Sequence, residues 1–239
     1  MSATLTCIST GSVGNSYILD VNGEKLILEL GVRWKDILST LDYRLDNVVA
    51  CICSHRHVDH IKSVPNALSY GLPVYSSADV ASIYPKVKVL EPMKKYTIGG
   101  FKVLPLSVPH GYCPNLAYHI TMPDGQTLLF ITDAERFPYN IKGCNHLLIE
   151  ANYSEELILD SLGNVDILRS HSQYHMALTE CISAVKRLRH GGLQSVILIH
   201  LSSGLSDENM FKDRFKSELG IDVWIAEKNL RFILDKQDF

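Results

Sequence analysis

Four residues of metal-binding type fall within six positions of this 239-residue chain. They are His55, His57, Asp59 and His60, in the order His-Arg-His-Val-Asp-His. Imidazole nitrogens and carboxylate oxygens both suit a borderline dication such as zinc. In an extended segment His55 and His57 point to one side. Asp59 and His60 follow as the backbone turns, so we expect them to face a second point nearby. The spacing indicates two metal ions rather than a polar loop with incidental histidines.

Three further residues of this type each follow an apolar run that predicts a buried strand. His110 follows residues 103–109, Asp133 follows residues 128–132, and His200 follows residues 196–199. A lone histidine at such a place is usually structural. Three strand-end residues together with the first cluster, however, form a coherent ligand set on a rigid scaffold.

The elements that must position these residues can be predicted from periodicity. Residues 48–53 predict a buried strand and residues 61–68 have helical spacing, so the first cluster is expected on a strand-to-helix loop. The other expected elements are strands at 4–9, 16–21, 25–30, 73–75, 116–122, 127–132, 147–149, 195–199, 223–226 and 230–234, a hairpin at 95–108 broken by Gly99-Gly100, and helices at 35–41, 79–84, 155–162, 178–188 and between Asp207 and Gly220. The strands come in two batches with helices after each. This order predicts an α/β fold with two mixed sheets packed face to face and helices outside, in a single domain over residues 1–239.

Composition limits the class of protein. The chain is 46% hydrophobic and 21% charged, and no stretch approaches the roughly 20 apolar residues of a membrane span. The N-terminus lacks the features of a secretory signal, and the six cysteines form no C-x-x-C pair, so we expect reduced thiols in a cytoplasmic protein without a membrane partner. The net charge of −3 lacks the basic field of a protein that grips long nucleic acid, which keeps a small anionic substrate open. A homodimer is compatible with the sequence.

The ordered motifs His-x-His-x-Asp-His, His, Asp and His resemble those of metallo-β-lactamase-fold hydrolases over essentially the whole chain. The resemblance implies an αββα sandwich with a dinuclear site at one sheet edge. It also implies two divalent ions, zinc first and manganese or iron as alternatives. The implied ligands are His55, His57 and His110 for the first ion, Asp59, His60 and His200 for the second, and Asp133 between them. Two such ions about 3.5–4 Å apart would activate a bridging hydroxide, and Asp59 is implied to help orient it.

Two segments are similar to the phosphodiesterase branch of this fold, which includes ribonuclease Z and the YycJ/WalJ-like exonucleases. Glu150 follows a buried strand, and His175 precedes an amphipathic helix. The resemblance implies that His175, supported by Glu150, protonates the leaving oxygen, with His171 ranked second for that role. Glu29 departs from the pattern because relatives commonly carry Asp there, and the long inserted arm of ribonuclease Z is missing.

The favoured hypothesis is therefore a dinuclear-metal phosphodiesterase that uses a metal-bridging hydroxide and acts as a nuclease on DNA or RNA. The first alternative is a phosphodiesterase for cyclic or other small nucleotides. The second is a carbon-ester, thioester or lactam hydrolase on the same fold, and a non-catalytic metal-binding module ranks last. Asn115, at the expected pocket mouth, is a candidate substrate contact.

Overall fold

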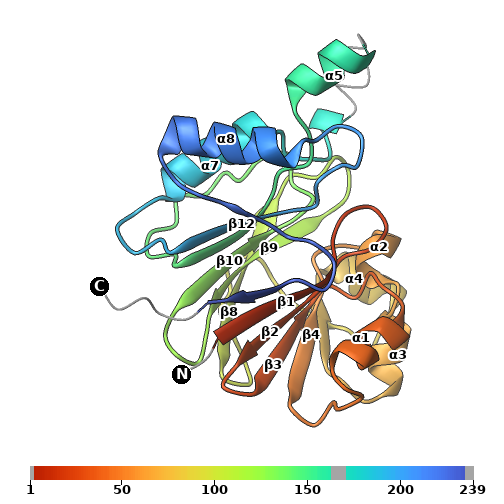
Figure 1. Ribbon diagram of the computed structural model, residues 1–239. Helices are drawn as coiled ribbons and strands as arrows, with labels where there is room; N and C mark the ends of the chain where they lie inside the picture. The colour runs from red at the N-terminus through yellow and green to blue at the C-terminus, as the bar shows by residue number, and fades with distance from the viewer. Residues whose placement is uncertain (1–2, 163–170, 235–239) are drawn as a thin grey trace.

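The computed structural model describes residues 3–162 and 171–234 and has four layers, with two sheets face to face between two groups of helices (Figure 1). This arrangement confirms the predicted αββα sandwich. The strands are β1 Ala3–Ser9, β2 Ser16–Val21, β3 Glu24–Leu28, β4 Val48–Ile52, β5 Val74–Ser76, β6 Lys88–Val89, β7 Tyr96–Ile98, β8 Phe101–Val108, β9 Asn115–Thr121, β10 Thr127–Ile131, β11 His146–Glu150, β12 Ser195–Ile199, β13 Trp224–Ile225 and β14 Arg231–Ile233. The helices are α1 Trp34–Thr40, α2 Val58–Ile61, α3 Val64–Ser69, α4 Ala78–Ile83, α5 Glu155–Leu162, α7 Leu178–Leu188 and α8 Glu208–Leu219.

Each sheet has an antiparallel part and a parallel part. The first sheet has the order β14-β1-β2-β3-β4-β5-β6 and is parallel from β3 to β6. The second has the order β13-β12-β11-β10-β9-β8-β7 and is parallel from β10 to β13. Because β8 and β10 are both antiparallel to β9, β8 ends at the same edge as β10, β11 and β12. This topology gathers residues that follow four different strands.

Three apolar layers hold the sandwich together. Leu5, Phe101 and Phe130 lie in the layer between the two sheets, each fully buried. A second layer lies between the first sheet and α1 to α4, and a third joins the second sheet to α7 and α8. Each buried side chain of this size contributes on the order of 1.5–3 kcal/mol, so the sheets form a rigid frame for the residues at their edge.

Local sequence signals explain where most elements begin and end. Asp207 caps α8 by accepting a hydrogen bond from the Met210 amide, and Gly220 ends that helix with a φ of 67°. The helix expected over 61–68 is instead two short helices, because the chain turns at Ser63. The Ser63 hydroxyl donates to the Val32 carbonyl there. As a result Asp59 and His60 lie inside α2 rather than on the loop before it.

Two other expectations concern chemistry rather than geometry. All six cysteines are buried and unpaired, which agrees with reduced thiols. In the residues that the structure describes, no helix combines the length and apolarity needed to cross a bilayer.

A buried histidine in β11 should make the stability of the protein depend on pH. His146 is 1% exposed, its Nδ1 lies 2.8 Å from the Ser195 hydroxyl, and its Nε2 lies 3.2 Å from Gln126 Oε1. Burial lowers the pKa of His146 to about 4. The unfolded chain therefore takes up a proton near the ordinary histidine pKa, while the folded chain stays neutral, so stability falls as pH drops from about 6.5 to 4.

Replacing this histidine should remove that loss. Between pH 7 and pH 5 the wild-type chain should lose about 2 kcal/mol more unfolding free energy than His146→Gln, since one pKa unit equals about 1.36 kcal/mol. Urea unfolding of both proteins in a chelator, at each pH, measures the difference. Parallel pH curves would contradict the assignment.

Candidate metal centre

Seven side chains that the sequence predicts as metal ligands meet at the shared edge of the two sheets. Their ligand atoms form groups in which all members lie within 4.8 Å of one another. The members are His55, His57, Asp59, His60, His110, Asp133 and His200. The loop after β4 and the short helix α2 provide four of them, and the ends of β8, β10 and β12 bring the other three from the second sheet. Their role as ligands remains a prediction.

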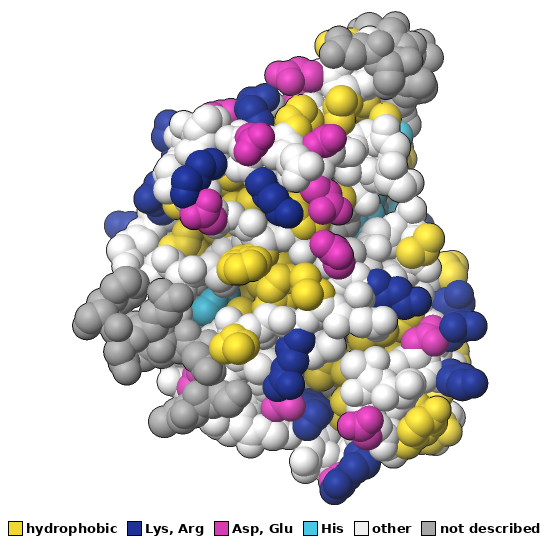
Figure 2. Space-filling view, in the orientation of Figure 1, with side chains coloured by type: hydrophobic (Ala, Val, Ile, Leu, Met, Phe, Trp, Pro, Cys, Tyr) yellow, Lys and Arg dark blue, Asp and Glu magenta, His cyan; other side chains and the backbone are white. Residues whose placement is uncertain are grey.

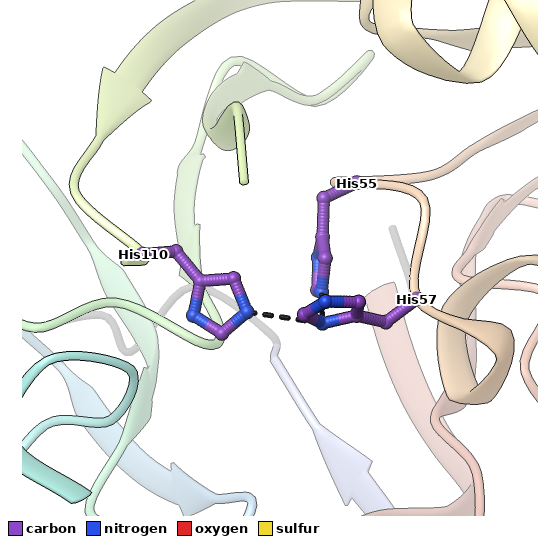
Figure 3. Close-up of side chains that lie close together, drawn as sticks. All are labelled: His55, His57 and His110. Atoms are coloured by element: carbon purple, nitrogen blue, oxygen red, sulfur yellow. Dashed lines mark hydrogen bonds between the residues drawn. The ribbon is translucent and has the colours of Figure 1, made fainter. Parts of the chain in front are cut away.

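His55, His57 and His110 form the first group, with their rings turned toward one another (Figure 3). His57 Nδ1 lies 2.9 Å from His55 Nε2 and 3.1 Å from His110 Nε2. Burial is the main cause that lowers the pKa of each ring, and for His55 the pKa falls well below its ordinary value. Three neutral imidazoles therefore present nitrogens to one point, which is the form in which histidine binds a metal.

The second group combines Asp59, His60 and His200, with Asp133 beside it. His60 Nε2 lies 3.4 Å from Asp59 Oδ2 and 3.0 Å from Asp133 Oδ2. His200 Nε2 lies 3.6 Å from Asp133 Oδ1 and 3.9 Å from Asp59 Oδ2. Asp133 also belongs to a group with His55 and His60, so it is the carboxylate that links the two sides of the cluster.

The ring nitrogen that faces away from the cluster is held in four of the five histidines. His55 Nδ1 contacts the Ser54 hydroxyl at 2.9 Å, and His110 Nδ1 donates to the Tyr174 carbonyl at 2.6 Å. His60 Nδ1 lies 3.3 Å from Glu29, and His200 Nδ1 lies 3.0 Å from Glu150. These contacts fix the ring orientation and leave each Nε2 directed into the cluster, an arrangement that metal-binding histidines commonly have.

The backbone is strained at three positions of the site. Glu29, Asp133 and His200 have positive φ values of 65°, 49° and 56°, in the left-handed region that disfavours side chains. Each comes directly after a strand (β3, β10 or β12) and turns its side chain toward the cluster. Strain of this kind concentrates at functional sites, where the surrounding packing maintains it.

The charges of the site fit divalent cations. In the described part of the chain, no lysine or arginine pairs with Asp59, Asp133 or Glu150. Burial opposes charge on His200, but Asp133 and its other carboxylate neighbours raise the pKa of His200 to about 10. Its Nε2 is buried without a hydrogen-bond partner. Buried carboxylates without a basic partner, beside neutral imidazoles, need positive charge that bound metal would provide.

Glu150 and His175 form a pair next to the cluster. Glu150 is fully buried, and its Oε1 lies 2.8 Å from His175 Nδ1 and 3.0 Å from His200 Nδ1. Burial opposes protonation of His175, but Glu150 outweighs it and raises the pKa of that ring. His171 lies further away, with its ring centroid 6.2 Å from that of His175 and its ring against Tyr153. The carboxylate partner is thus on His175, the histidine that the sequence ranks first.

Three asparagines behave differently from the sequence-based expectations. Asn115 was expected to contact substrate, but its side chain is buried and donates to the carbonyls of Thr132 and Asp133, so it supports the strained turn at Asp133. Asn15 Nδ2 lies 3.2 Å from His60 Nε2, and Asn152 Nδ2 donates to the His200 carbonyl. The sequence analysis did not identify Asn15 or Asn152 as site residues. Their closeness in sequence to predicted turns and ligands is the signal that could have found Asn152.

The carboxylate of Glu29 should strengthen metal binding through His60. Glu29 is fully buried, accepts hydrogen bonds from the Ser54 amide at 3.0 and 3.2 Å, and faces His60 Nδ1. Glu29→Gln keeps the shape but removes the charge. We expect metal affinity to fall about 10–100-fold without loss of fold, as for other groups that hold a ligand histidine.

Competition with a chromophoric zinc chelator would measure this affinity. Glu24→Gln is the matched control, because Glu24 lies on the same strand and is hydrogen-bonded to the Gly100 amide rather than to the cluster. Equal affinities for Glu29→Gln and Glu24→Gln would show that Glu29 serves the backbone alone.

Comparisons with known proteins agree with this geometry. The family model described as "Beta-lactamase superfamily domain" matches residues 35–201. Exodeoxyribonuclease WalJ of Streptococcus pneumoniae is 26% identical over 170 residues, and the alignment covers 63% of this chain and 63% of that relative. The metallo-β-lactamase fold protein YhfI from Bacillus subtilis superposes with a TM-score of 0.79 at 19% identity, covering 98% of this chain and 100% of YhfI. Human tRNase Z, short form, superposes with a TM-score of 0.68 at 12% identity, covering 96% and 98%.

Proposed function

The chain belongs to the β-lactamase superfamily and is a hydrolase of the metallo-β-lactamase fold, and from this premise we propose that it is a metal-dependent phosphodiesterase that cleaves DNA or RNA. The Glu150–His175 pair carries the proposal. A phosphodiester leaves behind an alkoxide, which departs far more readily when an acid protonates it. The relative WalJ is named an exodeoxyribonuclease, and this chain spans 63% of its length.

In this proposal the seven clustered side chains hold two divalent ions, with zinc as the first candidate. His55, His57 and His110 hold one ion, and Asp59, His60 and His200 hold the other. Asp133 contributes to both, because it belongs to groups on each side of the cluster. When bound, the ions supply Lewis-acid activation of water and neutralise charge that develops on the phosphodiester.

The remaining roles belong to residues of this chain. Asp59 is partly exposed and lines the cavity at the cluster, so its carboxylate is placed to orient the attacking water. His175 lines the same cavity, and its Nδ1 is occupied by Glu150, which leaves Nε2 to hand a proton to the leaving oxygen. Glu150 is a positioning residue, since it contacts His175 and His200 and is itself fully buried.

A small nucleotide is the second candidate substrate. The cavity at the cluster has a volume of about 270 Å³, which suits one nucleotide better than a long surface groove would. The net charge of −3 points the same way.

One set of assays tests the proposal. Purified protein is reconstituted with zinc or manganese and offered single-stranded DNA, RNA, cyclic nucleotides, a lactam and a thioester. We expect hydrolysis of the polymers, while exclusive hydrolysis of cyclic nucleotides would support the second candidate. Efficient turnover of the lactam or thioester with no phosphodiester cleaved would overturn the phosphodiesterase assignment.

A further inference from the structure

A second cavity, of about 450 Å³, lies beside the one at the metal-ligand cluster. The loop after β1 borders both, because Ser12 lines the cluster cavity and Val13 lines the second cavity. Helix α2 provides a second link. It carries Asp59 and His60, and Lys62 at its end lines the second cavity. Any extended molecule bound at the cluster can therefore reach the second cavity by passing this loop.

The second cavity is basic. Arg33, Lys62 and Lys228 line it, with Asp36 as the acidic residue among its lining. Asp36 is already paired with Arg33 through two hydrogen bonds of 2.9 Å. Among the residues that the structure describes, no carboxylate forms an ion pair with Lys62 or Lys228. Figure 2 shows Lys and Arg side chains around α1 and α2 at the right of the view, on a chain whose net charge is −3.

The carboxyl group of Asp36 responds to this local charge. Its pKa is lowered first by the hydrogen bond from Arg33, and Lys228 and Lys35 also contribute. The site therefore offers an anion two lysines whose positive charge no described carboxylate neutralises. Phosphate groups are the ligands that such surfaces attract.

The wall between the two cavities is rigid. The Gly14 amide donates to the Gly11 carbonyl, and the Gly31 amide donates to the Asn15 carbonyl. A Cβ on Gly14 would lie 2.5 Å from the Gly31 carbonyl oxygen, so the loop packs closely against the chain before α1. The floor of the second cavity includes the buried apolar side chains of Ile8 and Val32. A fixed wall, an apolar floor and cationic sides suit a nucleotide unit with its phosphate.

We propose that the cavity lined by Arg33, Lys62 and Lys228 binds a phosphate of a nucleic-acid strand, next to the phosphodiester held at the metal-ligand cluster. The proposal rests on the proposed function and selects its polymeric form. A cyclic mononucleotide has one phosphate and cannot occupy both places. A single strand has a phosphate at every nucleotide and can do so.

Binding of a fluorescein-labelled oligothymidylate, followed by anisotropy in a chelator that prevents cleavage, tests this directly. The double variant Lys62→Gln, Lys228→Gln should bind about tenfold more weakly than the unaltered chain. Each lost phosphate contact on a single strand flattens the plot of log K against log salt by about 0.7, so two should flatten it by about 1.4. Lys86→Gln, Lys102→Gln is the matched control, since it removes the same charge from exposed lysines outside both cavities.

Several outcomes would overturn the proposal: no oligonucleotide binding by the unaltered chain, equal binding by the double variant, or an equal loss in the control. A kinetic readout adds to this. The ratio of kcat/KM for the oligonucleotide to kcat/KM for bis(p-nitrophenyl) phosphate should fall about tenfold in the double variant. If no diester is cleaved while the lysine-dependent binding persists, the proposed function fails and the phosphate site stands. If DNA is cleaved and the lysines have no effect, the reverse holds.

Discussion

Asp133→Asn should remove hydrolysis almost completely, with a fall in kcat/KM of at least about 1,000-fold. Asp133 is 2% exposed and places Oδ2 3.0 Å from His60 Nε2 and Oδ1 3.6 Å from His200 Nε2. In the proposed function it is the carboxylate shared by both ions. An amide keeps the shape but loses the charge, so we expect bound metal to drop together with activity.

The variant should nevertheless fold. Asn tolerates the left-handed backbone at this position, where φ is 49°, better than most residues do. Metal content by elemental analysis, circular dichroism and turnover of one diester substrate measure the three effects separately. Asp46→Asn is the control, because Asp46 is an exposed carboxylate paired with Arg44 away from the cluster. Full metal content and turnover in Asp133→Asn would remove Asp133 from the proposed ligands.

The sequence predicts the sandwich and the gathering of the ligand set well because both depend on short-range patterns. Buried strands have apolar runs, and the polar residue after each run is the one that a sheet edge exposes. His110, Asp133 and His200 are identified in this way, and parallel strand direction brings them together. The αββα fold is confirmed by the solved structures as well as by the two sheets of this chain.

Features that depend on long-range contacts are harder to predict. Asn115 supports the Asp133 turn through hydrogen bonds across 17 and 18 positions, a pairing that no local pattern encodes. The split between α2 and α3 depends on the contact of Ser63 with Val32. The basic cavity joins Arg33, Lys62 and Lys228 from three distant segments, so the sequence shows isolated charges where the fold makes one site.

His175→Ala should separate substrates by the quality of their leaving group. A general acid contributes roughly 10²–10⁴-fold when the departing oxygen is a poor leaving group. Cleavage of DNA should therefore fall by about that factor in His175→Ala. A p-nitrophenolate leaves without help, so turnover of bis(p-nitrophenyl) phosphate should fall less than about tenfold. The ratio of kcat/KM for the two substrates is the measurement, and it is independent of any general loss of active protein.

His171→Ala supplies the comparison, because His171 lines the same cavity but lies on the far side of His175 from the Glu150 carboxylate contact. If His171 were the acid, its variant would show the leaving-group dependence and His175→Ala would lower both substrates equally. If neither variant discriminates, the enzyme does not protonate a leaving oxygen through these residues, and ester, thioester or lactam hydrolysis becomes the better assignment. The metal-ligand cluster is common to all these reactions, so the substrate class depends on what the Glu150–His175 pair does to the leaving group.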